Sequence, residues 1–280
     1  MEYTPMLLEK TEEPFDDERF IYEPKIDGHR ILPYRRNGSL RLYTKQRVEC
    51  TRQYPELQEM PTDDELVLDG EVCRIGPDGG IDFESVMQRF LTAKAGKIRS
   101  AAASDPVHVV VFDILERNGR DLRGLPLLER KQILRDSLGT NAYYSHSMVV
   151  PGEGKRLFEV IQERKMEGIV AKRADSLYVG RRSEHWQKII NYTYATVQLS
   201  GYHKDQFGWL AQYQGRPVGV IELAVPAVHR QAFYKVAGRL KTGEDRDNVY
   251  LEPRISARVR FRNWTSGGML RSPEFLEFVI

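Results

Sequence analysis

The sequence predicts an α+β protein with two domains, a larger mixed domain followed by a smaller domain built mostly of β-strands. Residues up to 192 combine apolar runs of strand length with segments of helical spacing. From residue 193 onward, short strand-like runs recur and one helical segment interrupts them. A length of 280 residues fits two such domains. We therefore expect domains at residues 1–192 and 193–280.

The composition indicates a folded, soluble protein. Hydrophobic residues make up 41% of the chain and charged residues 29%, and no apolar run reaches the roughly 18 residues of a membrane span. The N-terminus lacks the basic-then-apolar order of a secretion signal. Cys50 and Cys73 match no metal-binding spacing. We expect reduced thiols and a cytoplasmic location.

The first domain is expected to begin with an irregular segment, residues 1–19. Asn37-Gly38 separates two strand-like runs and is a strong hairpin signal. Residues 94–104 are small and polar and predict a connection, whereas Gly139 marks the end of a helix. The expected strands are residues 20–22, 30–36, 41–44, 65–72, 107–115, 168–172 and 186–190, and the expected helices are residues 54–60, 83–91, 126–138 and 154–166.

The second domain is expected to contain strands at residues 196–202, 208–213, 218–223 and 258–261, with a helix at residues 227–240. A Gln214-Gly215 turn separates the second and third of these strands. Several short strands with one inserted helix in about 85 residues are typical of a small Greek-key barrel of the OB type.

The stretch from Glu23 to Arg30 is the most suggestive of chemistry. Lys25 lies between two apolar runs, and Asp27-Gly28 follows it with turn chemistry, so the lysine is expected at a strand end. A glycine there lets the backbone and a ligand approach closely. An isolated lysine is usually a solvated charge, and it becomes a nucleophile only where its neutral amine is favoured. Its assignment therefore depends on residues elsewhere.

Five short motifs, in order, resemble those of the covalent nucleotidyltransferases, which include ATP-dependent DNA ligases, RNA ligases and mRNA capping enzymes. They are Lys25-Ile-Asp27-Gly28-His-Arg30, Asp69-Gly70-Glu71, Phe112-Asp113, Glu167-Gly-Ile-Val-Ala-Lys172 and Trp186-Gln-Lys188. Residues 167–183 and 264–273 are similar to the ligase module of bacterial end-joining DNA ligases. An ordered set is far more specific than a single motif. The resemblance covers nearly the whole chain and implies an ATP-grasp-like adenylation domain followed by an OB domain.

The resemblance implies an ATP-dependent DNA ligase that joins 5′-phosphate and 3′-hydroxyl ends at nicks in duplex DNA. Lys25 would attack the α-phosphate of ATP, AMP would pass to the 5′-phosphate, and the 3′-hydroxyl would then displace it. The OB domain would swing between these steps about a hinge at residues 191–195. The implied nucleotide-binding residues are Glu23, Lys25, Arg30, Lys45, Glu71, Phe112, Lys172, Lys188 and Arg271.

Individual roles carry alternatives. Glu71 and Glu167 offer the oxygen ligands that Mg²⁺ or Mn²⁺ prefers. The resemblance also gives Glu71 a ribose contact, Glu23 an adenine contact and Phe112 a stacking role, although Phe112 equally suits core filling. The strand expected at residues 65–72 places Asp69 and Glu71 on one face; a turn role is the alternative for Asp69, and Glu71 is favoured as the functional carboxylate. Trp186 is expected to pack in the core.

A basic stripe in the second domain predicts DNA binding. Arg258, Arg260 and Arg262 alternate with apolar residues, so a strand would place the three arginines on one face. With Arg254 they match a phosphate backbone; the alternative is an exposed edge strand kept soluble by charge. Arg181 and Arg182 are predicted to bind DNA as well, or to lie in a solvated loop.

Two departures from the family pattern qualify the resemblance. Relatives usually carry a second lysine two residues after Lys188, where this chain has Ile190, so one phosphate-neutralising charge is missing. Thr44-Lys45 replaces a Ser-Arg pair, and Lys45 is predicted to contact the nucleotide, with the nearby Arg47 as the alternative. An RNA ligase, a capping guanylyltransferase and a non-catalytic nucleic-acid-binding relative remain alternatives. The protein is expected to act as a monomer near the bacterial nucleoid, in repair, recombination or replication.

Overall fold

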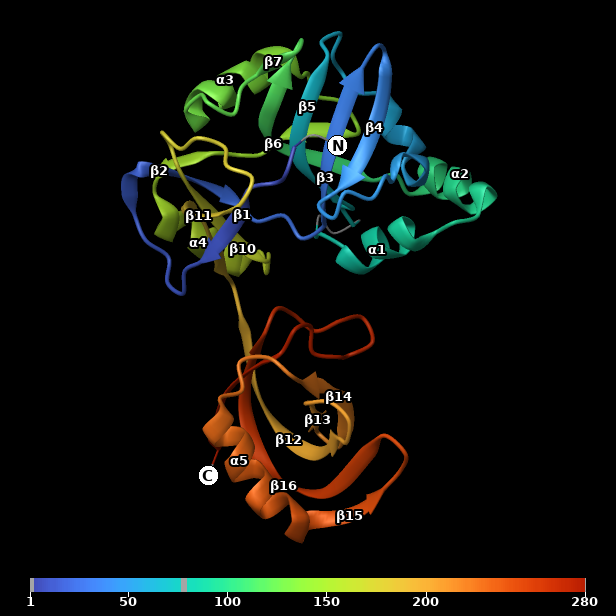
Figure 1. Cartoon of the computed structure of the whole chain (residues 1–280), viewed down its shortest axis with the longest axis vertical. Coiled ribbons are helices and arrows are strands. Elements are labelled where there is room, and N and C mark those ends of the chain that lie inside the picture. The colour runs from blue at the N-terminus through green and yellow to red at the C-terminus, as the bar shows by residue number, and fades with distance from the viewer. Residues whose placement is uncertain (1–2, 77–79, 280) are drawn as a thin grey trace. The chain divides into compact units, whose positions relative to one another are not determined.

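The computed structural model describes residues 3–76 and 80–279, which form two compact units (Figure 1). The units are Met1–Asn191 and Tyr192–Ile280, so the division lies next to the boundary expected from the sequence. In the described part of the chain no helix is long and apolar enough to cross a lipid bilayer.

Two β-sheets form the framework of the first unit (Figure 1). The first sheet has the order β1 (Leu7–Lys10), β11 (Arg182–Ile190), β10 (Gly168–Arg173), β2 (Asp17–Pro24) and β9 (Val150–Gly152). The second has the order β4 (Ser39–Thr44), β3 (His29–Arg36), β5 (Leu66–Cys73), β6 (His108–Arg117) and β7 (Arg120–Asp121), and β8 (Tyr144–His146) also pairs with β6.

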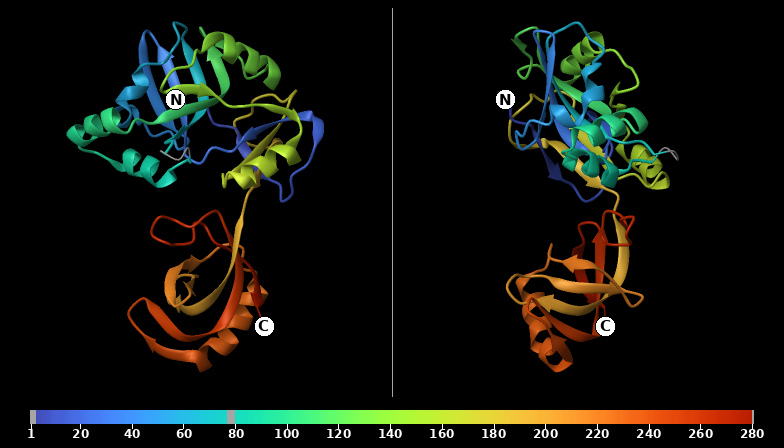
Figure 2. Two further views of the ribbon diagram at one scale, coloured as in Figure 1. Left: turned by 180° about the vertical axis from the view of Figure 1, so that it is seen from behind. Right: turned by 90° about the vertical axis from the view of Figure 1, so that its right-hand side faces the viewer.

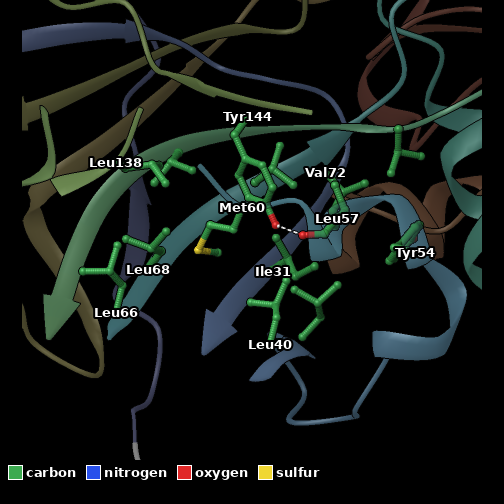
Figure 3. Close-up of a cluster of buried hydrophobic side chains, with 14 of the residues drawn as sticks. Ile31, Leu40, Tyr54, Leu57, Met60, Leu66, Leu68, Val72, Leu138 and Tyr144 are labelled. Atoms are coloured by element: carbon green, nitrogen blue, oxygen red, sulfur yellow. Dashed lines mark hydrogen bonds between the residues drawn. The ribbon is translucent and has the colours of Figure 1, made fainter. Parts of the chain in front are cut away.

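Three hydrophobic clusters hold these sheets in place. The inter-sheet core joins residues of both sheets and consists of Tyr3, Met6, Ile21, Leu32, Tyr34, Val67, Leu115, Leu127, Tyr178 and Trp186. A second cluster lies on the other face of the second sheet, where Tyr144 Oη donates a hydrogen bond of 2.7 Å to the Leu57 carbonyl (Figure 3). A third joins helix α4 (Gly154–Glu163) to the other face of the first sheet.

The strands at the centre of the second sheet are buried on both faces, so a polar side chain on them lies inside the protein. On β3, Ile31 and Leu32 point to opposite faces, and both are fully buried. In sequence, strands that are buried on both faces are usually continuous apolar runs. On β5 the run is broken by Asp69 and Glu71, which share the face that carries Val67 of the inter-sheet core. The two carboxylates are therefore held between the sheets.

Three expectations about local structure were wrong. The segment 1–19 is not irregular throughout, because β1 pairs in parallel with β11 and β2 already begins at Asp17. Residues 54–60 form no α-helix; two 3₁₀ turns, η1 (Thr51–Gln53) and η2 (Pro55–Gln58), occupy this region. The predicted connection at residues 94–104 is helix α2 (Ala95–Ser104), whose run of alanines has a high helix propensity.

The other helices agree with the expectation from spacing. Helix α1 (Phe83–Leu91) begins after Asp82, whose side chain accepts a hydrogen bond from the Ser85 backbone N–H and caps the helix. Helix α3 (Leu127–Ser137) packs against β6 and contributes Leu127 to the inter-sheet core. The hairpin between β3 and β4 turns at Asn37-Gly38, where both residues have positive φ. This confirms the hairpin signal.

The second unit is a curved sheet with one helix, the OB-type arrangement expected from the sequence (Figure 2). Its elements are β12 (Thr193–His203), β13 (Trp209–Tyr213), β14 (Arg216–Ile221), α5 (Ala227–Ala237), η3 (Gly238–Leu240), β15 (Lys241–Glu244), β16 (Asn248–Phe261) and β17 (Glu274–Val279). Trp209 and Phe233 fill the core of the unit. The Phe275 N–H donates a hydrogen bond of 3.1 Å to the Leu223 carbonyl, which draws the two ends of the sheet together.

Candidate active site

The turn that carries Lys25 connects the two sheets of the first unit. Lys25 follows β2, and its backbone N–H donates a hydrogen bond of 2.8 Å to the Gly168 carbonyl of β10. Gly28 lies against β5, where an added Cβ would come within 1.9 Å of the Val72 carbonyl oxygen. The turn is therefore anchored on one side to the first sheet and on the other to the second, and residue 28 must be glycine.

The Lys25 side chain contacts Glu167. Lys25 Nζ donates a hydrogen bond of 2.7 Å to Glu167 Oε2, and the two side chains are 19% and 3% exposed. Glu167 is placed by Gly168, which has a φ of 151° and lies so close to β11 that a Cβ would meet the Ile189 carbonyl oxygen at 2.1 Å. The lysine is thus neither solvated nor sealed in, and a ligand can reach it.

Glu71 completes the acidic side of the site. It lies on β5 directly opposite Arg30 of β3. Burial raises the pKa of the Glu71 carboxyl to about 7, against the opposing effect of Lys25 and Arg30, and the nearby Asp69 and Asp27 carboxylates raise it further. A carboxyl with such a pKa exchanges its proton near neutral pH, which is a property of functional sites more than of structural ones.

Lys188 lies on the basic side, on β11. Burial lowers the pKa of the Lys188 amine, and the positive charges of Lys25, Arg182, Lys10 and Lys45 lower it further, in that order of importance. Lys188 also stands opposite Val170, which in turn stands opposite Glu23. The structure therefore brings together Lys25, Glu71, Glu167 and Lys188 with Arg30, and it places Lys45 near enough to act on them.

Glu23 forms a second, deeper charged group with two lysines. It is 2% exposed, accepts a hydrogen bond of 2.9 Å from Lys172 Nζ and pairs with Lys131 of helix α3. Lys172 Nζ lies 4.3 Å from the ring centroid of Phe112 and 4.2 Å from that of Trp186. Burial lowers the pKa of Lys172 to about 8, against the opposing charge of Glu23. No sequence motif pointed to Lys131.

Asp69 lies in strand β5, as expected, and the alternative of a turn is wrong. It is fully buried within β5 and accepts two hydrogen bonds from Arg30, 2.8 Å from Nε and 2.5 Å from Nη2. Tyr178 Oη donates a further hydrogen bond of 2.6 Å to Asp69, and Arg30 Nη1 donates one of 2.6 Å to the Met6 carbonyl. These contacts fix Arg30 beside Glu71. The motif gave no sign of Tyr178 or of the Met6 carbonyl.

Asp113, Phe112 and Trp186 also have defined surroundings. Asp113 and Arg130 are both fully buried and joined by hydrogen bonds of 2.9 and 2.8 Å, so Asp113 serves the structure. Trp186 is 1% exposed, as expected of a packing residue. Phe112 is partly buried against the inter-sheet core, and its ring faces both Lys172 and Arg30. Phe112 therefore contributes to the core, and its stacking on a nucleotide base stays a prediction.

The arginine stripe in the second unit lies on an interior strand. Strand β16 runs between β12 and β17, so the alternative of an exposed edge strand is wrong for Arg258 and Arg260. Val259 and Phe261 are fully buried on the other face, as the alternation predicted. Arg260 Nε lies 2.8 Å from Glu274 Oε2, and Arg258 Nη1 lies 3.8 Å from Glu277 Oε1. Two glutamates of β17 therefore offset part of the positive charge.

The remaining predicted residues lie near the surface. Arg181 and Arg182 are exposed at the start of β11, and Arg182 contacts the Leu8 carbonyl. Arg254 is exposed and pairs with Glu252 at 2.8 Å. Arg262 and Arg271 are partly buried in the second unit, where the Arg262 N–H donates to the Arg271 carbonyl at 3.0 Å. Among residues 3–76 and 80–279, no three His, Cys, Asp or Glu side chains are grouped as metal ligands.

Comparison with known proteins gives the geometry a context. The family model described as the ATP dependent DNA ligase domain matches residues 5–189. The SPbeta prophage-derived DNA ligase-like protein LigB of Bacillus subtilis is 35% identical over 277 residues, which are 97% of each chain. The multifunctional non-homologous end joining protein LigD of Mycolicibacterium smegmatis is 25% identical over 98% of this chain but only 38% of its own length.

Solved structures support the predicted fold class. The ligase domain of M. tuberculosis LigD aligns with a TM-score of 0.61 and 23% identity, covering 99% of this chain and 95% of that one. A structure described as a Lig E DNA ligase aligns over the full length of both chains with a TM-score of 0.71 and 14% identity. At these identities the likeness concerns the fold.

Proposed function

Because the chain belongs to the ATP-dependent DNA ligase family, an enzyme family that uses ATP and DNA as substrates, we propose that it seals nicks between 5′-phosphate and 3′-hydroxyl ends in duplex DNA. The observation that carries the proposal is the contact between Lys25 and Glu167 at the junction of the two sheets. It joins two separate sequence motifs in one partly exposed site, where the lysine can reach a bound nucleotide.

In the first step, Lys25 Nζ would attack the α-phosphate of ATP and release pyrophosphate, leaving a lysine–AMP phosphoramide. AMP would then pass to the 5′-phosphate of the nick, and the 3′-hydroxyl would displace it. Phosphoryl transfer of this kind depends mainly on positioning and on neutralising charge. Lys188 and Lys45 are the cations proposed to face the triphosphate, together with Arg271 of the second unit. We also propose that the second unit swings about residues 191–195 between these steps.

Lys25 must lose a proton before it attacks. Lys25 Nζ lies 2.7 Å from Glu167 Oε2, and its positive charge lowers the pKa of the nearby Lys188. The Lys25 charge also acts on Glu71, whose pKa is raised to about 7, chiefly by burial. These are the titratable groups around the proposed nucleophile.

Glu71 and Glu167 also suit a divalent cation. Mg²⁺ is commonly held by one or two carboxylates together with substrate phosphates, and two buried carboxylates beside the lysine fit that pattern. When bound, Mg²⁺ or Mn²⁺ would neutralise charge on the phosphates. For the base, Phe112 and the Glu23–Lys172 pair are the proposed neighbours. Both Glu23 oxygens already face lysines, so an adenine contact at Glu23 would use its backbone.

Nick sealing by the wild type and by Lys25→Ala tests the proposal. With ATP and Mg²⁺ we expect the wild type to seal a nicked DNA duplex and to form a covalent, alkali-stable protein adduct with α-labelled ATP, and Lys25→Ala to do neither. Lys155→Ala is the matched control, because Lys155 is exposed on helix α4, beyond the opposite face of the first sheet. A wild type that forms no Lys25-dependent adduct would refute the proposal, and nicked RNA or GTP as preferred substrates would redirect it.

A further inference from the structure

We propose that Lys10 binds the triphosphate of ATP together with Lys188, so that strand β1 supplies a positive charge that β11 itself lacks. The inference rests on the proposed function, because it concerns the first step of that reaction. It adds a residue from outside the five motifs to the phosphate-binding side of the site.

The strand register carries the first part of the inference. β1 and β11 are parallel, and Lys10 stands opposite Lys188, with Glu9 opposite Gln187. The Thr11 N–H donates a hydrogen bond of 3.0 Å to the Lys188 carbonyl, which fixes the register at this point. Residues opposite each other on adjacent strands, about 4.8 Å apart, project to the same face of a sheet. The two lysines therefore emerge side by side.

The face on which they emerge is the one that carries the site. The register of β1 against β11 shifts between Leu8 and Glu9, so the side on which Lys10 emerges follows from its pairing with Lys188. On β11, Trp186 belongs to that core and stands two residues before Lys188. The charges of Lys25 and Lys10 both lower the pKa of Lys188, which agrees with three amines sharing one side of the sheet.

A polyphosphate can displace Glu12 from its ion pair with Lys10. Lys10 Nζ lies 3.3 Å from Glu12 Oε1, and the two side chains are 32% and 55% exposed. Ion pairs this exposed add little stability. By contrast, adjacent ammonium groups repel each other until an anion joins them, so a triphosphate gains more from the lysine pair than a single carboxylate does.

Strand β11 offers no second cation at the corresponding place. Ile190, two residues beyond Lys188 and on the same face, is apolar and 5% exposed. Lys10 provides the additional charge from the neighbouring strand instead. Lys188 and Lys10 thus form a pair across two strands.

The test compares Lys10→Gln and Lys10→Arg with Lys155→Gln, a loss of the same charge on the far side of the sheet. Single-turnover formation of the enzyme–AMP adduct from α-labelled ATP is measured at several ATP concentrations. We expect Lys10→Gln to lower kcat/KM about tenfold, and Lys10→Arg, which keeps the charge, to retain most of it. Lys155→Gln should match the wild type.

A second substrate separates phosphate binding from folding. A nick whose 5′ end is already adenylated needs no ATP, so Lys10→Gln should seal it as fast as the wild type does. In the Lys10→Gln background, Ile190→Lys should restore part of the lost adduct formation, because it returns a lysine to the same face. A Lys10→Gln protein equal to Lys155→Gln in adduct formation, or equally slow on both kinds of nick, would overturn the inference. A wild type that forms no adduct at all would instead refute the proposed function.

Discussion

Two groups of charged side chains in the first unit use the same residue types in different ways. In the closed pairs, Arg130–Asp113 and Arg30–Asp69, each guanidinium donates two hydrogen bonds to a fully buried carboxylate. In the open group, formed by Lys25, Glu71, Glu167 and Lys188, Lys25 donates a hydrogen bond to Glu167, and the pKa values of Glu71 and Lys188 are shifted.

This difference separates structural from functional charge. A buried pair with matched donors and acceptors is stable in one geometry, and removal of either partner leaves an uncompensated charge. The open group has instead been taken partly out of water, and burial shifts the pKa values of Glu71 and Lys188. Shifted pKa values and partial exposure occur together in the open group, as we expect of the proposed site.

The largest expected effect is at Lys25. Lys25→Met should lower formation of the AMP adduct by at least about a thousandfold, because no other amine takes the place of the nucleophile. The melting temperature should fall less than it does when a closed pair is broken, since the Lys25 side chain is 19% exposed. Adduct labelling and a thermal melt on the same preparation check both statements. A variant that loses labelling only because it has unfolded would contradict the distinction between the two groups.

The closed pairs should respond in the opposite manner. Asp113→Asn leaves the Arg130 guanidinium buried without its counter-charge and should lower the free energy of unfolding by about 3–5 kcal/mol. Urea denaturation measures this change. The control is Asp175→Asn, because Asp175 makes a comparable two-bonded pair with Arg173 on the surface, where loss of the charge should leave the denaturation midpoint nearly unchanged. Equal destabilisation by both substitutions would remove burial as the explanation.

The lowered pKa of the buried Lys172 should make the free energy of unfolding depend on pH. Its pKa is lowered from 10.5 to about 8 in the folded chain, chiefly by burial. Between these values the unfolded chain binds more protons than the folded one, so the contribution of Lys172 to the free energy of unfolding rises with pH. The difference in unfolding free energy between wild type and Lys172→Met should therefore move in favour of the wild type between about pH 8 and 10. A difference that stays constant would mean that Lys172 titrates normally.

The smallest effects are expected in the second unit. Its Arg258 belongs neither to the closed pairs nor to the open group, because its side chain is 53% exposed. Arg258→Gln should weaken binding to nicked DNA about threefold and reduce the slope of log affinity against log salt by about one, as loss of one phosphate contact does. Glu277→Gln should strengthen binding, because Glu277 lies 3.8 Å from Arg258 and offsets its charge. Arg246→Gln is the control, since Arg246 is 95% exposed in a turn. Fluorescence anisotropy over a salt series would show opposite signs for the first two variants.

Much of the framework could be predicted because it follows from local patterns. The alternation around Arg258, the Asn37-Gly38 hairpin and the apolar run of β6 were each visible in a few consecutive residues. The order of the motifs likewise identified Lys25, Glu71, Glu167 and Lys188 as neighbours, and the structure brings these four together.

The partners of the site residues could not be predicted, because they come from segments without a local pattern. Lys131 reaches Glu23 from a helix 108 positions further along the chain, and Tyr178 reaches Asp69 from a loop. Strand β1 was missed for the same reason, since four residues paired in parallel with a distant strand show no periodicity of their own. The arginine partner of Asp69 was also unforeseen, because Asp-Gly usually indicates a turn and the motif gives no sign of a buried ion pair.

Gly28 sets a limit for anyone who would redesign this enzyme for another nucleotide. Its missing side chain is what lets the lysine turn rest directly on the backbone at Val72, one residue after Glu71. The backbone contact therefore fixes Lys25 relative to Glu71, and a substitution at residue 28 should move the two side chains apart. Diversity belongs instead around Phe112 and Lys172, whose side chains lie beside the place proposed for the base.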